Sequence, residues 1–111
     1  MSPSPCYLLI SSCPPAAAEE LARALVERGL AACVSLTASR SVYRWRGELC
    51  REEEVTLTAK VSAEALAECA AALRALHPYE LPEVISLQVS PEGSLPEYLS
   101  WVRAESRPTG A

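Results

Sequence analysis

The sequence lacks the features that identify membrane, secreted and nucleic-acid-binding proteins. Its longest apolar run is far short of the ~20 residues that cross a bilayer, and its first residues lack the basic segment of a secretory signal. It has no lysine or arginine cluster and a net charge of −4, so it offers nucleic acid no basic face. We therefore expect a cytoplasmic protein with no membrane insertion and no nucleic-acid partner.

Motifs of the common enzyme classes are missing as well. The chain has no G-x-S-x-G elbow, no Walker loop and no H-E-x-x-H helix. Its single histidine, His77, excludes any mechanism that needs two imidazoles. These absences predict that the chain is not an enzyme.

Cysteine is present, but not in a pattern that builds a site. The five cysteines make an odd number and no two have C-x-x-C spacing, which argues against a disulfide framework and a zinc ribbon. Free thiols packed as small apolar side chains are the simplest interpretation. Cys33 has apolar neighbours that favour packing over a redox or soft-metal role, whereas Cys50 is expected to be exposed and open to adventitious metal.

The hydropathy pattern predicts alternating strands and helices. The strands are expected over residues 6–12, over 30–36 with a bent continuation to 45, over 54–61 and over 83–90, with a turn at Gly47. The helices are expected over residues 16–28, 62–77 and 94–103. Gly29 and Ser62 are expected as helix caps, and Pro78 is expected to end the second helix at His77. Residues 94–97 fit a capping box, and residues 107–111 are expected to form a frayed tail.

This element order defines the fold class. A βαββαβ order is typical of an α+β, ferredoxin-like antiparallel sheet with two helices on one face, here followed by a C-terminal helix. The length of 111 residues fits a single domain over residues 1–111. The sheet face without helices is then free to meet a neighbouring subunit.

Five segments together resemble the CutA family of divalent-cation tolerance proteins. They are LVERGLAACV, VYRWRGE, the Glu54 to Lys60 strand, HPYELPE and PEYLSWVR, and the likeness covers about residues 7–104. The turn after the first strand, SCPP, departs from the family's usual pattern. The resemblance implies a homotrimer, a broad likeness to PII signalling proteins and a role in divalent-metal tolerance, with copper as the ion usually proposed.

The resemblance also implies a metal site and a cleft. His77 and Cys13 are the expected metal ligands for weakly bound copper(II), because imidazole and thiolate both suit copper. The alternative for His77 is a structural role at the helix end. Polar and aromatic family positions are expected to line an intersubunit cleft, where they bind a small ligand, such as an anionic metabolite held by Lys60, or a protein, or else form only salt bridges and ring packing. These positions are Tyr43, Trp45, Glu54, Lys60, Tyr79 and Glu83.

Overall fold

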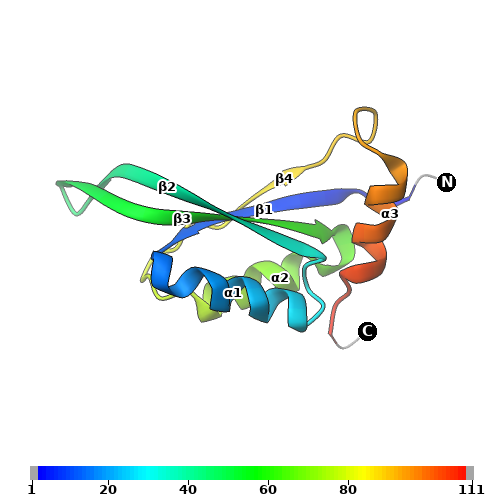
Figure 1. Ribbon diagram of the computed structural model, residues 1–111, viewed down its shortest axis with the longest axis horizontal. Coiled ribbons are helices and arrows are strands. Elements are labelled where there is room, and N and C mark those ends of the chain that lie inside the picture. Colours follow the sequence, from blue (N-terminus) through cyan, green and yellow to red (C-terminus); the bar gives the residue numbers. More distant parts are fainter. Residues whose placement is uncertain (1–2, 110–111) are drawn as a thin grey trace.

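A computed structural model describes residues 3–109 as a four-stranded antiparallel sheet with two helices on one face (Figure 1). The elements are β1 (Cys6–Cys13), α1 (Pro15–Glu27), β2 (Cys33–Trp45), β3 (Glu48–Ser62), α2 (Ala63–Leu76), β4 (Ile85–Gln88) and α3 (Pro96–Glu105). The strand order in the sheet is β2-β3-β1-β4, with every neighbouring pair antiparallel. The predicted α+β, ferredoxin-like βαββαβ fold with a C-terminal helix is confirmed.

The core lies between the sheet and the helices α1 and α2. The apolar face predicted for the first helix is buried, with Leu25 fully inside, and so is the alternating face of β3 from Leu57 to Val61. Burial of each leucine side chain stabilises the folded state by about 1.5–3 kcal/mol relative to leaving it exposed. Patterning of apolar residues at periods of 3.6 and 2 therefore sets which faces meet.

Single residues set the boundaries of α1 and α2 where the sequence indicated. Gly29 has a φ of +71°, which lets the chain leave α1 while the N–H of Leu30 bonds to the carbonyl of Leu25 at 3.0 Å. Ser62 caps α2 by accepting from the N–H of Ala65 at 3.2 Å. His77 has extended backbone angles (φ −71°, ψ 136°), the geometry that a following proline imposes.

The β2–β3 hairpin is the longest feature of the fold and reaches past the helices (Figure 1). Its strands pair up to Trp45 opposite Glu48, so the turn contains only Arg46 and Gly47. Both have positive φ, 50° and 82°, as the common two-residue hairpin turn requires. β1 pairs with β3 only as far as Cys13 opposite Val55. In the outer part of the hairpin, no described strand therefore covers the edge of β3 that faces away from β2.

Three expectations at element ends need correction. The strand expected over residues 83–90 is shorter, Ile85–Gln88. The capping box over residues 94–97 is wrong, because the Ser94 hydroxyl donates to the Ser90 carbonyl at 2.6 Å and α3 starts without a side-chain cap. The expected frayed tail is tied down through Thr109 by bonds from Arg107 N to Gly29 O (2.8 Å) and from Thr109 N to Glu68 (2.9 Å). Residues 110–111 lie outside the described residues.

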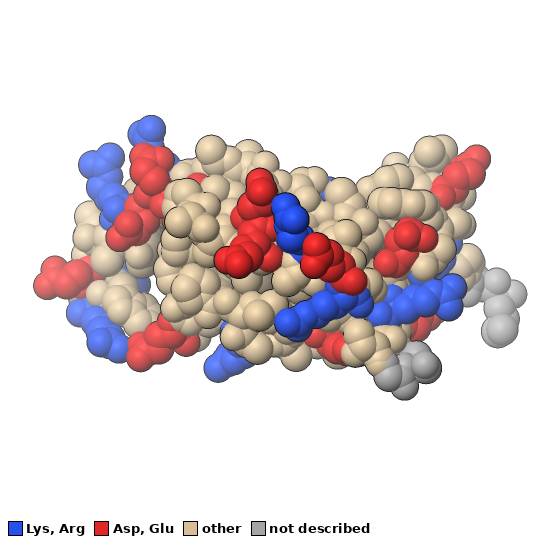
Figure 2. Space-filling view, turned by 60° about the horizontal axis from the view of Figure 1, so that its bottom comes forward, with Lys and Arg blue, Asp and Glu red and all other residues tan. Residues whose placement is uncertain are grey.

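The surface carries charges of both signs. Figure 2 shows acidic and basic side chains interspersed over the face that it presents, including the end of the hairpin. No basic patch dominates that view. Within residues 3–109, no helix combines the length and the apolar character needed to span a membrane.

Candidate functional site

A pocket of about 700 Å³ lies where the outer hairpin faces the loop between α2 and β4. The end of β1 contributes Ser12 and β3 contributes Glu54. The remaining lining residues come from β2, its turn and the loop: Ser41, Val42, Tyr43, Trp45, Arg46, Tyr79, Glu80, Leu81 and Glu83. The pocket therefore depends on segments that are far apart in the sequence.

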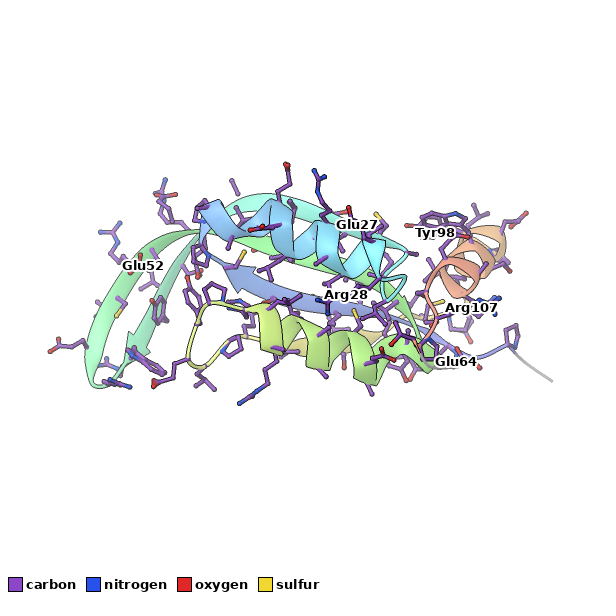
Figure 3. The ribbon with its side chains drawn as sticks, turned by 90° about the horizontal axis from the view of Figure 1, so that it is seen from below. Glu27, Arg28, Glu52, Glu64, Tyr98 and Arg107 are labelled. Atoms are coloured by element: carbon purple, nitrogen blue, oxygen red, sulfur yellow. The ribbon has the colours of Figure 1, made fainter. Side chains whose placement is uncertain are left out.

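The hairpin that forms one wall of the pocket lies at the opposite end of the molecule from α3. Figure 3 shows this separation through Glu52, labelled on the hairpin, and Tyr98, labelled on α3.

Five of the six residues expected in the cleft line this pocket, and Lys60 is the exception. The ammonium group of Lys60 donates to the Ser35 hydroxyl at 2.6 Å and lies 4.0 Å from the Cys33 sulfur. Lys60 pairs with Cys33 across β2 and β3, about six residues further along β3 than Glu54. Within one described chain, the structure does not bring Lys60 to the pocket.

Glu54 is a buried carboxylate in the pocket wall, only 6% exposed. The Tyr79 hydroxyl donates to its Oε2 atom at 2.6 Å. Burial, and then this hydrogen bond to a charged acceptor, raise the pKa of Tyr79 above its usual value. The tyrosine therefore stays a donor, and the pair joins β3 to the loop after α2.

His77 is 7% exposed, and both of its ring nitrogens have partners. The Nε2 atom lies 2.9 Å from the carbonyl oxygen of Ser12, and the N–H of Tyr79 donates to Nδ1 at 3.2 Å. Since Nδ1 accepts, Nε2 carries the proton and donates. The imidazole also packs against the Tyr79 ring at a centroid distance of 4.9 Å. In this arrangement, neither nitrogen has a free lone pair for a metal.

Cys13 is fully buried in the hydrophobic core. Burial, and then the nearby charge of Glu54, raise the pKa of its thiol, which disfavours the thiolate that binds metals. Within residues 3–109, no three His, Cys, Asp or Glu side chains gather closely enough to hold an ion. The metal role of His77 and Cys13 stays a prediction.

The rim of the pocket is polar. The Ser12 hydroxyl donates to Glu83 at 3.1 Å. Arg46 pairs with Glu80 at 2.7 Å, and its guanidinium lies 5.2 Å from the centre of the Trp45 ring. Sequence reasoning did not assign Arg46 or Glu80 to the cleft, although each is adjacent in sequence to a residue that was assigned. Arg46 reaches Glu80 from the hairpin turn. The turn at residues 46–47 is the only sequence feature that could have pointed to this contact.

Comparison with known proteins agrees with this fold. Residues 7–105 match the family described as CutA1 divalent ion tolerance protein. A divalent-cation tolerance protein CutA of Thermus thermophilus is 41% identical over 87 residues, which are 78% of this chain and 82% of that protein. The human protein CutA is 42% identical over 78% of this chain but only 48% of its own length. The chain thus spans about half of that relative.

Solved structures show the same architecture. A structure described as the PII-like protein CutA from Nostoc, in apo form, has a TM-score of 0.90 and 40% identity, covering 93% of this chain and 99% of that one. Another, described as a periplasmic divalent cation tolerance protein CutA from Archaeoglobus fulgidus, has a TM-score of 0.82 and 28% identity over 87% of this chain and 94% of that one. The sequence match and the shared fold together show that this chain belongs to the CutA1 divalent ion tolerance protein family.

Proposed function

We propose that this chain acts in divalent-cation tolerance as a PII-like homotrimer, and that the hairpin pocket is its ligand site. The observation that supports the site is the convergence of five expected cleft residues on one pocket of about 700 Å³. That volume is in the range of small-molecule sites, and aromatic walls with a few polar groups are their usual lining. The family membership supports the physiological role.

The trimer is supported by apolar side chains on the sheet. Ile85 and Leu87 on β4 are 52% and 53% exposed, and their register partners on β1 are Ile10 and Leu8. An exposed apolar patch of this kind is typical of a subunit interface. Light scattering should give about three times the 11.9 kDa mass of one chain. A mass of one chain would contradict the homotrimer.

The two tryptophans give a matched test of the pocket. Trp45 lines it, whereas Trp101 lies on α3, and their exposures are similar, 37% and 44%. In a thermal-shift screen, we expect compounds that stabilise the unchanged protein to lose their effect on Trp45→Leu and keep it on Trp101→Leu. A screen without hits, or hits that Trp45→Leu retains, would contradict the pocket as the ligand site.

Weak copper(II) binding by His77 and Cys13 is a second proposal, supported by the divalent-ion name of the family. Ligation by His77 requires that one of its two hydrogen bonds breaks. Copper should be titrated into metal-free protein with a competing chelator, using His77→Ala and Cys13→Ser, with Cys50→Ser as the control for an adventitious thiol. Saturable binding that His77→Ala abolishes would support this site, and binding that survives both changes would contradict it.

The proposal also includes a single domain over residues 1–111 and a cytoplasmic location. Limited proteolysis should leave residues 7–105 as one resistant fragment, and cleavage into two stable fragments would contradict one domain. Fractionation of the source cells should place the protein with cytoplasmic markers, and recovery with periplasmic markers would contradict that location.

A further inference from the structure

Glu54 is the one buried Asp, Glu, Lys or Arg residue in residues 3–109, and no Lys or Arg of that range pairs with it. The other buried polar residues are serines and His77, whose Nδ1 atom accepts a hydrogen bond. The ion pairs among the described residues involve Glu19, Glu53 and Glu80, and no Lys or Arg nitrogen of those residues lies within 4.0 Å of Glu54. A buried carboxylate is costly unless it is both hydrogen-bonded and neutralised by a counter-charge.

The hydrogen bonds of Glu54 are also incomplete. Its Oε2 atom accepts from Tyr79, but Oε1 has no hydrogen-bond partner among the described residues. Oε1 is not sealed in the protein either, because the only fully enclosed side-chain oxygen or nitrogen without a partner in the described part is Oγ of Ser11. Since Glu54 lines the pocket, its free acceptor is open to a donor that enters there.

The walls around this carboxylate also favour positive charge. Three carboxylates and one guanidinium line the pocket, and the guanidinium of Arg46 is already paired with Glu80. Tyr43, Trp45 and Tyr79 supply aromatic faces, which attract cations through their quadrupoles. Arg46 already lies 5.2 Å from the Trp45 ring centre. Within one described chain, the amine of Lys60 donates to Ser35 instead and does not line the pocket.

We propose that the pocket binds a small organic cation, an ammonium group carried on a flat apolar body. The ammonium donates to Oε1 of Glu54, and the apolar body lies against the aromatic side chains of the hairpin and the loop. This inference rests on the proposed function, because it names the ligand class of the same pocket. It replaces the anionic metabolite that the family resemblance suggested.

The test compares three probes of one shape: benzylamine, benzyl alcohol and benzoate. Each is titrated into the full-length protein and followed by backbone amide NMR shifts. We expect benzylamine to bind about tenfold more tightly than benzyl alcohol, the equivalent of one charge-assisted hydrogen bond, and benzoate not to bind. This series uses the unchanged protein, so it does not depend on whether any variant folds.

Glu54→Gln then removes the charge and keeps the shape. Its amide oxygen can still accept from Tyr79, so the fold should be retained. We expect benzylamine affinity to fall about tenfold, to the level of benzyl alcohol. The matched control is Glu53→Gln, which removes a neighbouring exposed charge that pairs with Arg40, and it should leave benzylamine affinity unchanged.

The outcomes separate this inference from the proposed function. Equal binding of all three probes, or tightest binding of benzoate, would overturn the cation assignment and leave the pocket as the ligand site. Binding of none would overturn both. Loss of the trimer in Glu54→Gln but not in Glu53→Gln would assign the counter-charge to a neighbouring subunit, and would also overturn the inference.

Discussion

The Nε2 atom of His77 lies 2.9 Å from the carbonyl oxygen of Ser12, which is 65 residues earlier in the chain. This contact joins the end of α2 to the end of β1. The other ring nitrogen accepts from the N–H of Tyr79, and Tyr79 in turn donates to Glu54. The only histidine of the chain therefore orients the loop that forms one wall of the pocket.

Replacing His77 should lower stability by about 2 kcal/mol, because His77→Ala removes two buried hydrogen bonds and leaves the Ser12 carbonyl unpaired. His77→Gln should lose less, since its amide N–H can still donate to that carbonyl. Urea unfolding at one fixed protein concentration measures both changes, with concentration held constant because subunit association contributes to stability. Equal stability of His77→Ala and the unchanged protein would show that the two hydrogen bonds of His77 do not stabilise the fold.

The Tyr79–Glu54 pair predicts a loss of stability at high pH. Burial and the bond to Glu54 raise the pKa of Tyr79 above its ordinary 10.0, so the folded state favours the neutral phenol. Its contribution is complete below the unfolded-state pKa and is lost as pH rises from about 10 toward the higher folded-state value.

Tyr79→Phe isolates this effect, because Tyr43 and Tyr98, whose pKa values are also raised, remain in both proteins. The free energy of unfolding should fall more steeply above pH 10 for the unchanged protein than for Tyr79→Phe. Parallel curves would show that Tyr79 titrates alike in the folded and unfolded chains.

The cysteines should differ widely in reactivity. Burial raises the pKa of the Cys69 thiol to about 12 from 9.0, which makes its thiolate roughly a thousandfold scarcer at neutral pH. Cys6 and Cys13 are also buried with raised pKa values, whereas Cys50 on the hairpin is half-buried. Alkylation of the native protein, followed by peptide mass spectrometry, should modify Cys50 well before these three. Uniform labelling would contradict the described packing.

Two buried serines should respond oppositely to alanine. The hydroxyl of Ser11 is fully enclosed without a hydrogen bond, so Ser11→Ala should raise the free energy of unfolding by up to about 1 kcal/mol. Ser62 accepts from Ala65 N and donates to the Ser106 carbonyl, so Ser62→Ala should lower it by about 1–2 kcal/mol. Chemical denaturation of both variants measures the two changes in the free energy of unfolding. A loss of stability in Ser11→Ala would show that the Ser11 hydroxyl has a hydrogen-bond partner.

Most of the fold could be predicted because its signals are local. The period of apolar residues gave the faces of α1 and β3, Gly29 and Pro78 set two helix ends, and Gly47 placed the hairpin turn. The missing catalytic motifs predicted a non-enzyme, and membership of a divalent-cation tolerance family agrees. Each of these features depends on residues close together in the sequence.

The site could be predicted only in part. Six residues were assigned to one cleft, but Lys60 lies six residues beyond Glu54 on β3, roughly 20 Å at the usual rise of a strand, and does not line the pocket. The expected capping box is absent because the Ser94 hydroxyl donates to the Ser90 carbonyl and does not accept from the first turn of α3. The tail was expected to fray because composition does not reveal its bonds to Gly29 and Glu68.

The sequence by itself determined the elements, their order and the residue types available for a site. Only the tertiary structure decided that Glu54 is buried beneath Tyr79, 25 positions away, and that both nitrogens of His77 are hydrogen-bonded. Burial and hydrogen-bond partners depend on segments distant in sequence, which meet only after the sheet, the hairpin and the loop have packed together. The charge and the free acceptor that define the pocket follow from that packing.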